Sequence, residues 1–293
     1  MMDREQEGLK WQVGVWDRIS SIYLRAIDNR FTGVVDALIR RAALQSVHEV
    51  LDLGTGTGSV AIKAASLVMP GGNVTAVDIS PEMLDLARQR SASLGLSNIE
   101  FLEGRAEELP AHTGRFDVVL ASLSLMYVID RAAAAREIAR VLRPSGRFVA
   151  AVWGGPEEAD IVLFQQTAGS FGPAPPVPGV GPGALADPSG FLAELEGAGI
   201  SASVESETTG FAFEDFSSAW DVLAGVTTAQ LPLERQNEAR AAVRAKMWRE
   251  GDGPRHFRNL TQFIVGIGQQ RSAVAVSNPE TRHKVDYGNH PRT

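Results

Sequence analysis

A glycine-rich turn is the feature that most constrains the fold of this chain. Residues 48–53 have the pattern of a short buried strand, and Gly54, Gly56 and Gly58 follow at alternate positions. Glycine permits backbone angles that other residues rarely adopt, and it lets a ligand approach the main chain closely. A helix predicted over 59–68 begins directly after the turn, and its first N–H groups suit an anionic ligand. The pattern predicts a strand–turn–helix unit that binds a ligand.

Strand and helix patterns alternate on both sides of this turn. Strands are predicted at 48–53, 73–78, 99–103, 116–122 and 147–153, and helices at 59–68, 81–94 and 131–142. The capping serine Ser80, followed by Pro81, marks the start of the second of these helices. Strands that alternate with helices require crossover connections in a largely parallel sheet. The fold class is therefore α/β, with a doubly wound sheet.

The two ends of the chain depart from this alternation. An amphipathic helix or helix pair is predicted over 9–29, with Trp11, Val15, Ile19, Ile22 and Ala26 on one face, and a further helix over 32–43. Six of the fifteen prolines fall in 172–188, which is either an ordered loop or a flexible lid. Helices at 191–198, 214–224 and 233–248 and strands at 201–208 and 259–267 are predicted around and after it.

These patterns divide the chain into four parts. Residues 1–45 form an N-terminal helical cap, and residues 46–154 form the cofactor-binding half of the sheet. Residues 155–270 hold an acceptor-side insertion with lid helices and the remaining strands. Residues 271–293 are polar and aperiodic, and we expect a mobile tail.

Composition excludes several classes of function. The chain has 28 basic and 35 acidic residues, a net charge of −7, which disfavours nucleic acid as a partner. It has no cysteine, so disulfide frameworks, thiolate metal sites and cysteine nucleophiles are absent. The five histidines are too scattered to form a metal cluster, and we expect no bound metal. No apolar run reaches the roughly 20 residues of a membrane span. A cytoplasmic protein without a membrane span is expected.

An acidic residue at the end of the second strand defines the ligand further. Asp78 lies where a carboxylate accepts hydrogen bonds from the two hydroxyls of a ribose. The dinucleotide pattern Gly-x-Gly-x-x-Gly fails here, because Ser59 and Ala61 occupy the positions where it requires glycine. Asp52, inside the strand end, repels a pyrophosphate and favours an ammonium group. The combination indicates S-adenosylmethionine rather than NAD.

At these residues the chain resembles the class I S-adenosylmethionine-dependent methyltransferases, and within them the small-molecule branch that includes the ubiquinone/menaquinone-biosynthesis C-methyltransferases. The resemblance rests on residues 52–58, 77–84, 103–110, 116–119 and 136–147, together with Gly251-Asp252-Gly253-Pro254 near the C-terminal end. It implies a Rossmann-like, seven-stranded, mostly parallel sheet with N-terminal helices and a helical lid insertion. It also implies that S-adenosyl-L-methionine is the cofactor.

The resemblance assigns cofactor contacts residue by residue. Asp52, Gly54, Thr55 and Gly56 are expected around the methionine part of the cofactor, and Ser122 near its ammonium group. Asp78 is expected to hold the ribose, Ile79 to pack on the adenine, and Ala106 to present its backbone to the adenine edge. Relatives often have an acid just before that alanine, whereas this chain has Arg105.

Candidates for the chemistry are fewer. Tyr127 follows the fourth strand, and either orients a substrate oxygen or packs in the core. Tyr23, with Trp16 on the same predicted helix, either covers the cofactor or is a core aromatic residue. His256 is either a surface histidine or a catalytic base.

The predicted function is methyl transfer to carbon or oxygen of a small, fairly apolar metabolite, because the chain lacks the Asn/Asp-Pro-Pro motif of amino-group methyltransferases. An NAD(P)-dependent oxidoreductase, or a non-methylating protein that binds S-adenosylmethionine, is the alternative.

Overall fold

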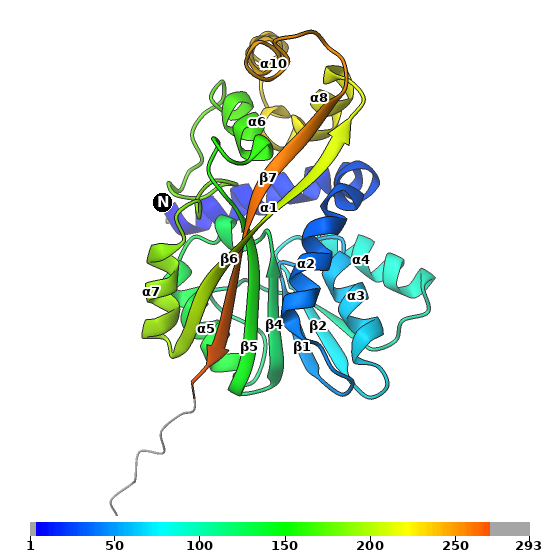
Figure 1. The fold of residues 1–293 in the computed structure, drawn as a ribbon, viewed down its shortest axis with the longest axis vertical. Helices are drawn as coiled ribbons and strands as arrows, with labels where there is room; N and C mark the ends of the chain where they lie inside the picture. The colour runs from blue at the N-terminus through cyan, green and yellow to red at the C-terminus, as the bar shows by residue number, and fades with distance from the viewer. Residues whose placement is uncertain (1–3, 270–293) are drawn as a thin grey trace, which may run out of the picture.

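Seven strands form one sheet in the order β3-β2-β1-β4-β5-β7-β6 in the computed structural model, which describes residues 4–269 (Figure 1). The strands are β1 Glu49–Leu53, β2 Asn73–Asp78, β3 Ile99–Glu103, β4 Phe116–Ser122, β5 Leu142–Trp153, β6 Ile200–Phe213 and β7 Arg255–Gly268. The first five pair in parallel, and β7 is antiparallel to both β5 and β6. The predicted doubly wound, mostly parallel sheet is confirmed. The tail expected at 271–293 lies outside the described residues.

Helices connect and cover these strands. They are α1 Arg4–Ile22, α2 Thr32–Ala42, α3 Ser59–Val68, α4 Pro81–Ser93, α5 Arg131–Val141, α6 Asp160–Gly169, α7 Ser189–Gly197, α8 Phe216–Leu223, α9 Gly225–Thr228 and α10 Leu233–Met247. A π-turn at Tyr23–Ile27 and a 3₁₀ turn at Asp28–Phe31 join α1 to α2, and a second 3₁₀ turn spans Leu125–Tyr127. The strand order reverses between β1 and β4. Right-handed crossovers therefore put α3 and α4 on one face of the sheet and α5 on the other.

Local sequence explains where the helices of the first half begin and end. The Ser80 hydroxyl accepts a hydrogen bond from the Met83 amide at 3.2 Å, and Pro81 occupies the first position of α4. Asp130 caps α5 by accepting from the Ala133 amide at 2.9 Å. Gly95, at φ 69°, follows the end of α4. From residue 32 to residue 141 the predicted elements are found within one or two residues, whereas the helix or helix pair predicted over 9–29 begins earlier, at Arg4, and gives way to the two turns after Ile22.

The elements of the second half differ more from prediction. The strands predicted at 201–208 and 259–267 are longer in the structure, where β6 and β7 have 14 residues each. Helix α6 is absent from the prediction. The prediction for β6 lacks residues 209–213, where Gly210 interrupts the strand pattern, although these residues also pair with β7. The first residues of β5 were predicted to end a helix and form a turn. They extend the strand instead, with a register shift opposite Phe116 and Val118. The long β6–β7 pair rises above the rest of the sheet, where α6, α8 and α10 gather (Figure 1).

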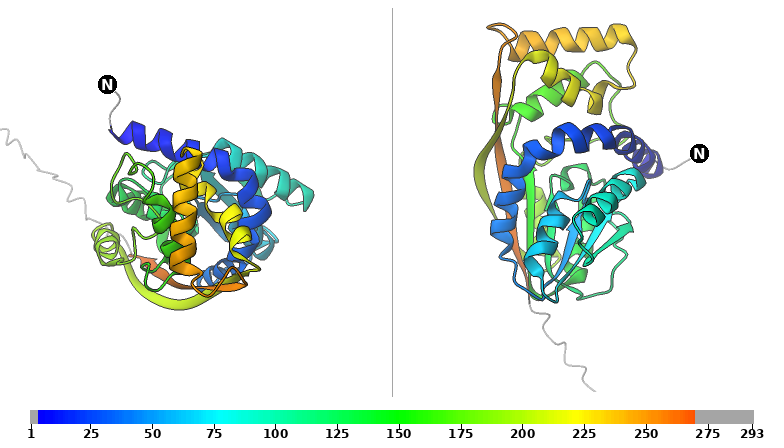
Figure 2. Two further views of the ribbon diagram at one scale, coloured as in Figure 1. Left: turned by 90° about the horizontal axis from the view of Figure 1, so that it is seen from above. Right: turned by 90° about the vertical axis from the view of Figure 1, so that its right-hand side faces the viewer.

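Helix α1 crosses the top of the sheet, between the strand ends and the upper helices (Figure 2). The sequence predicted an apolar buried face. Val15 and Ile19 are buried as expected, but Trp11, Ile22 and Ala26 are only half-buried. The polar residue Gln12 is buried instead. Its Nε2 donates to the Tyr127 carbonyl at 2.6 Å, which compensates the amide for the loss of water.

Two further polar contacts hold α1 over the strand ends. Glu5 pairs with Arg105 at 2.8 Å, and Asp17 accepts from the Ser80 hydroxyl at 2.6 Å. The proline-rich segment is also held in place, since the Gly181 amide donates to the Met126 carbonyl at 3.0 Å. Over residues 4–269, none of the helices combines the length and apolarity needed to span a bilayer.

Candidate functional site

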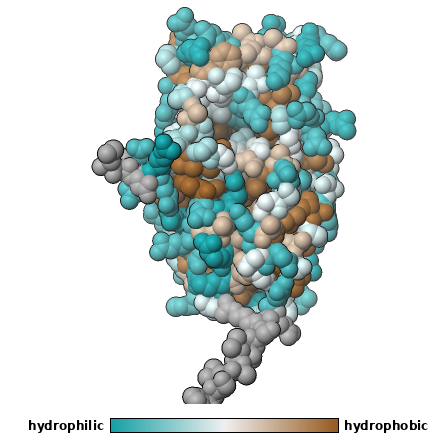
Figure 3. All heavy atoms as spheres, turned by 90° about the vertical axis from the view of Figure 1, so that its left-hand side faces the viewer, coloured by the Kyte–Doolittle hydropathy of each residue, from teal (hydrophilic) through white to brown (hydrophobic). Residues whose placement is uncertain are grey.

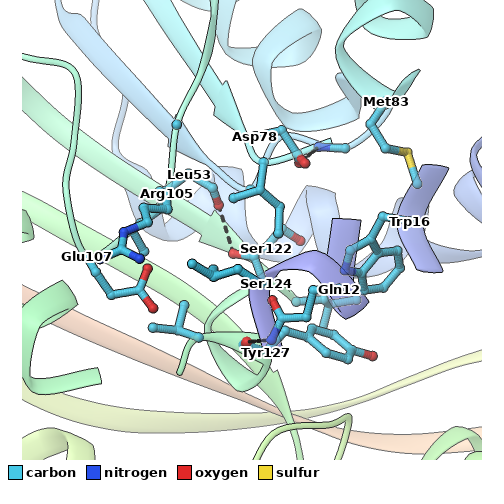
Figure 4. Close-up of a pocket in the computed structure, with 18 of the residues that line it drawn as sticks. Gln12, Trp16, Leu53, Asp78, Met83, Arg105, Glu107, Ser122, Ser124 and Tyr127 are labelled. Carbon is cyan, nitrogen blue, oxygen red and sulfur yellow. Dashed lines mark hydrogen bonds between the residues drawn. The ribbon is translucent and has the colours of Figure 1, made fainter. Parts of the chain in front are cut away.

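A cavity lies beneath α1, at the carboxyl ends of β1, β2 and β4 (Figure 4). In a doubly wound sheet, ligands bind in the crevice where the strand order reverses, which here is between β1 and β4. The cavity is lined by Leu9, Gln12, Trp16, Tyr23, Leu53, Gly54, Gly56, Asp78, Ile79, Met83, Gly104, Arg105, Ala106, Glu107, Ser122, Leu123, Ser124, Tyr127 and Val128.

The glycine turn forms one wall of this cavity. Gly54, Gly56 and Gly58 have φ values of 71°, 54° and 86°, which L-residues with side chains rarely adopt. Space also requires glycine at Gly54, because a Cβ there would collide with the side chain of Ser124. At Gly56 a Cβ would meet no protein atom within 4 Å. Gly56 therefore leaves open the space into which a ligand fits.

Asp78 stands beside the turn at the end of β2. Its carboxylate accepts from the Gly56 amide at 2.8 Å and from the Ser80 amide at 2.9 Å. Burial raises its pKa, and the three backbone N–H groups around it oppose that shift. A carboxylate accepts about four hydrogen bonds, so acceptor capacity is left for a ligand hydroxyl. This position fits the predicted contact with a ribose.

Asp52 and Thr55 are not among the residues that line the cavity. They lie behind the turn, where the Thr55 hydroxyl donates to Asp52 Oδ2 at 2.6 Å. Asp52 Oδ1 is buried without a hydrogen-bond partner among the described residues, and burial raises the pKa of Asp52 to about 7. The expected contacts of these two residues with the cofactor stay predictions. The orphaned oxygen is compatible with a cationic group near the turn.

The remaining predicted cofactor residues meet in the cavity. Ile79, Arg105, Ala106 and Ser122 come from the loops after β2 and β3 and from the end of β4, and all four line it. The Arg105 guanidinium pairs with Glu5 of α1, so Arg105 joins the wall of the cavity to the helix that covers it. Figure 4 shows Arg105 and Glu107 together on the side opposite Met83 and Trp16.

Three aromatic residues line the cavity where it approaches α6. The Trp16 ring packs edge-to-face on Tyr127 at 4.9 Å and on Tyr23 at 6.4 Å. Burial raises the pKa of both tyrosines well above its usual range, with Asp28 contributing at Tyr23. Their hydroxyls therefore stay protonated at neutral pH, and the role predicted for either tyrosine toward a substrate stays a prediction. Aromatic faces also favour a nearby positive charge such as a sulfonium.

His256 lies elsewhere in the structure. It is exposed on β7, opposite Ala212 of β6, and does not line the cavity. The structure thus brings Tyr23 and Tyr127 together and leaves His256 apart from them, as the surface-histidine reading expects.

Sequence reasoning missed several residues of the site, notably Gln12, Leu53, Met83 and Ser124. The Ser124 hydroxyl donates to the Leu53 carbonyl at 2.7 Å and fixes the loop after β4 against the turn. Leu53 and Met83 lie within the motif segments 52–58 and 77–84, and Gln12 lies one turn of helix from Gly8 and Trp16 on a face that includes Val15, whereas Ser124 has no such signal.

Two more cavities adjoin the first on the side of α6. The larger one lies between α1, α6, α9 and the proline-rich segment, and the smaller one lies above Tyr23. Trp16 and Tyr127 line all three cavities. The space-filling view in Figure 3 has a hollow bordered by apolar surface near the middle of the molecule.

Comparison with known proteins agrees with this geometry. Residues 44–164 match the family model described as a methyltransferase domain. The ubiquinone/menaquinone biosynthesis C-methyltransferase UbiE of Pseudomonas putida is 39% identical over 112 residues, which are 38% of this chain and 44% of that protein. The demethylmenaquinone methyltransferase of Chlorobaculum tepidum is 39% identical over 133 residues, 45% of this chain and 52% of that one. The chain spans about half the length of these curated relatives.

A solved structure with the same fold is that of the YcgJ protein from Bacillus subtilis. Its TM-score is 0.60 at 23% identity, over 80% of this chain and 98% of that one. At this identity the likeness concerns the fold alone. The sequence match and the cavity at the glycine turn agree in indicating a class I S-adenosylmethionine-dependent methyltransferase domain over residues 44–164, similar to the ubiquinone/menaquinone C-methyltransferases.

Proposed function

We propose that the protein transfers the methyl group of S-adenosylmethionine to a carbon or oxygen atom of a small, neutral, fairly apolar metabolite. The observation that carries the proposal is that the cofactor cavity and two mostly apolar cavities share Trp16 and Tyr127 in their walls. This arrangement supports an acceptor that reaches the cofactor from the side of α6.

The residues of the first cavity suit the cofactor in shape and charge. Gly54 and Gly56 would leave room for its methionine part, Asp78 would hold the ribose, and Ile79 and Met83 would contact the adenine. When bound, S-adenosylmethionine supplies an activated methyl group on a sulfonium, so the protein has mainly to position the acceptor and exclude water. Helix α1 suits that task because it covers the cavity above the strand ends, and Trp16 and Tyr127 lie where the cavity borders the acceptor cavities.

The identity of the acceptor does not follow from the relatives. The family model ends at residue 164. Strand β6, helices α9 and α10, and the proline-rich wall of the large cavity all follow that residue. The names of the relatives favour carbon as the methylated atom, and the acceptor class proposed here rests on the cavities themselves.

Calorimetric titration with S-adenosylhomocysteine, with NADH as a parallel control, tests the cofactor. Saturable micromolar binding of the first and none of the second is expected. Radiolabelled S-adenosylmethionine and a panel of small neutral aromatic compounds then test transfer. Binding of NADH alone would revive the oxidoreductase alternative. Product formed without release of S-adenosylhomocysteine would favour the non-methylating one.

A further inference from the structure

One side chain of the acceptor cavities has an unusual combination of burial and missing partners. Gln165, on α6, is 6% exposed and lines both the large cavity and the smaller one above Tyr23. Glutamine is mostly exposed in folded proteins, and when buried its polar atoms are generally hydrogen-bonded. Gln165 therefore calls for a functional explanation.

The orientation of the Gln165 amide is fixed by chemistry. Nε2 donates to the Leu223 carbonyl at 2.9 Å, and a carbonyl only accepts, so the amide cannot be reversed without setting two oxygens against each other. Oε1 therefore faces away from Leu223. It is buried and has no hydrogen-bond donor among the described residues.

Most of the residues that line the smaller cavity with Gln165 are apolar, and Tyr23 and Tyr127 are the lining residues with hydroxyl groups. The apolar ones include Ile161, Pro182, Leu223 and Val226. Of the described residues that line the two cavities, Arg18 alone carries a charge, and it belongs to the large cavity. A ligand in the smaller cavity meets a mostly apolar wall in which Oε1 of Gln165 lacks a donor.

We infer that Gln165 recognises a hydrogen-bond donor, such as a hydroxyl group, on the methyl acceptor. The inference rests on the proposed function and adds a specificity residue to it. A buried carbonyl without a partner has lost its hydrogen bonds to water, and a ligand hydroxyl restores one of them. A ligand of the same shape without the hydrogen leaves the oxygen unpaired, and sites of this kind reject such analogues strongly.

A matched pair of probes tests this on the full chain, saturated with S-adenosylhomocysteine. Affinities for 1-naphthol and 1-methoxynaphthalene are measured by calorimetry on the wild type and on Gln165→Met, which keeps the length of the side chain and removes the carbonyl. The wild type is expected to prefer 1-naphthol by about tenfold or more. Gln165→Met is expected to bind both probes within about twofold of each other.

Gln89→Met is the matched control, because Gln89 is exposed on α4 and lines none of the three cavities. It should keep the wild-type preference. If Gln165→Met does not fold, Gln165→Asn, which draws the amide back by one methylene, should lose the preference in the same way.

The outcomes separate the inference from the proposed function. A preference that survives in Gln165→Met, or a wild type that binds neither probe or does not prefer 1-naphthol, overturns the role of Gln165. Failure of the wild type to bind S-adenosylhomocysteine at all overturns the proposed function first.

Discussion

The carboxylate of Asp78 accepts a hydrogen bond from the amide of Gly56 at 2.8 Å, and so joins the end of β2 to the glycine turn after β1. The acid expected to hold the ribose therefore also fixes the turn expected to surround the methionine part. Changes at either residue should be felt in cofactor affinity.

Asp78→Asn should weaken S-adenosylhomocysteine binding by about 1–3 kcal/mol, or roughly 5- to 150-fold in Kd. The amide has one acceptor oxygen where the carboxylate has two, and it carries no charge. Calorimetry measures the change. Asp85→Asn, at an exposed aspartate of α4 paired with Arg88, is the control and should leave Kd unaltered. Equal affinities for wild type and Asp78→Asn would remove Asp78 from the site.

The two cavity glycines should respond differently to alanine. Gly54→Ala creates a collision with Ser124 and is expected to destabilise the fold. Gly56→Ala meets no protein atom within 4 Å, so it should add only the roughly 1–2 kcal/mol of a left-handed alanine while obstructing the ligand. Urea unfolding and calorimetry separate these effects. Gly114→Ala, at φ 64° with open space around it, is the control for backbone strain. Unchanged cofactor affinity in Gly56→Ala would contradict this arrangement.

Tyrosine ionisation tests the burial of Tyr23 and Tyr127. Because burial raises the pKa of both hydroxyls, neither should ionise in the native protein at pH 10.5. The double variant Tyr23→Phe/Tyr127→Phe should therefore show the same native tyrosinate absorbance at that pH as the wild type. In guanidinium chloride the wild type should gain absorbance from both residues, and the double variant should not. Lower native absorbance in the double variant would mean that a hydroxyl of the pair is accessible to base.

The stability of the ligand-free protein should reflect Asp52. Burial raises its pKa from 3.8 to about 7, so the folded state holds the proton more tightly than the unfolded state. Its contribution to the free energy of unfolding is therefore largest below about pH 4 and falls as pH rises to about 7. Asp52→Asn should remove this pH dependence. Between pH 5 and pH 8 the free energy of unfolding of the variant should therefore rise by about 1–3 kcal/mol relative to that of the wild type.

Urea unfolding at the two pH values measures this difference. Asp85→Asn serves again as the control, since that carboxylate is exposed. Parallel pH dependence in wild type and Asp52→Asn would show that Asp52 is ionised at ordinary pH in the folded protein.

The sequence predicted the first half of the fold well because the signals there are local. The glycine turn, the cap at Ser80 and the apolar strands each depend on residues close together in the chain. Asp78 was found for the same reason, by its place at the end of a strand.

The acceptor side could not be predicted in this way. The amide of Gln165 is oriented by Leu223, 58 residues away, and Gln12 is buried by a bond to Tyr127, 115 residues away. Neither partner is visible in a local pattern. For Asp52 and Thr55 the motif is recognisable in the sequence, but it does not reveal that the two side chains lie behind the turn and not in the cavity wall.

Helix α1 is synthesised before every element that it contacts. It packs on α4 and α9, and it reaches Arg105 and Tyr127 through Glu5 and Gln12. All packing contacts of α1 can therefore form only after α9 has been synthesised, long after the glycine turn and Asp78 have left the ribosome. A nascent chain halted after β5 would present the loops of the cofactor cavity without their finished cover, so closure of the cavity is a late event in the biogenesis of this protein.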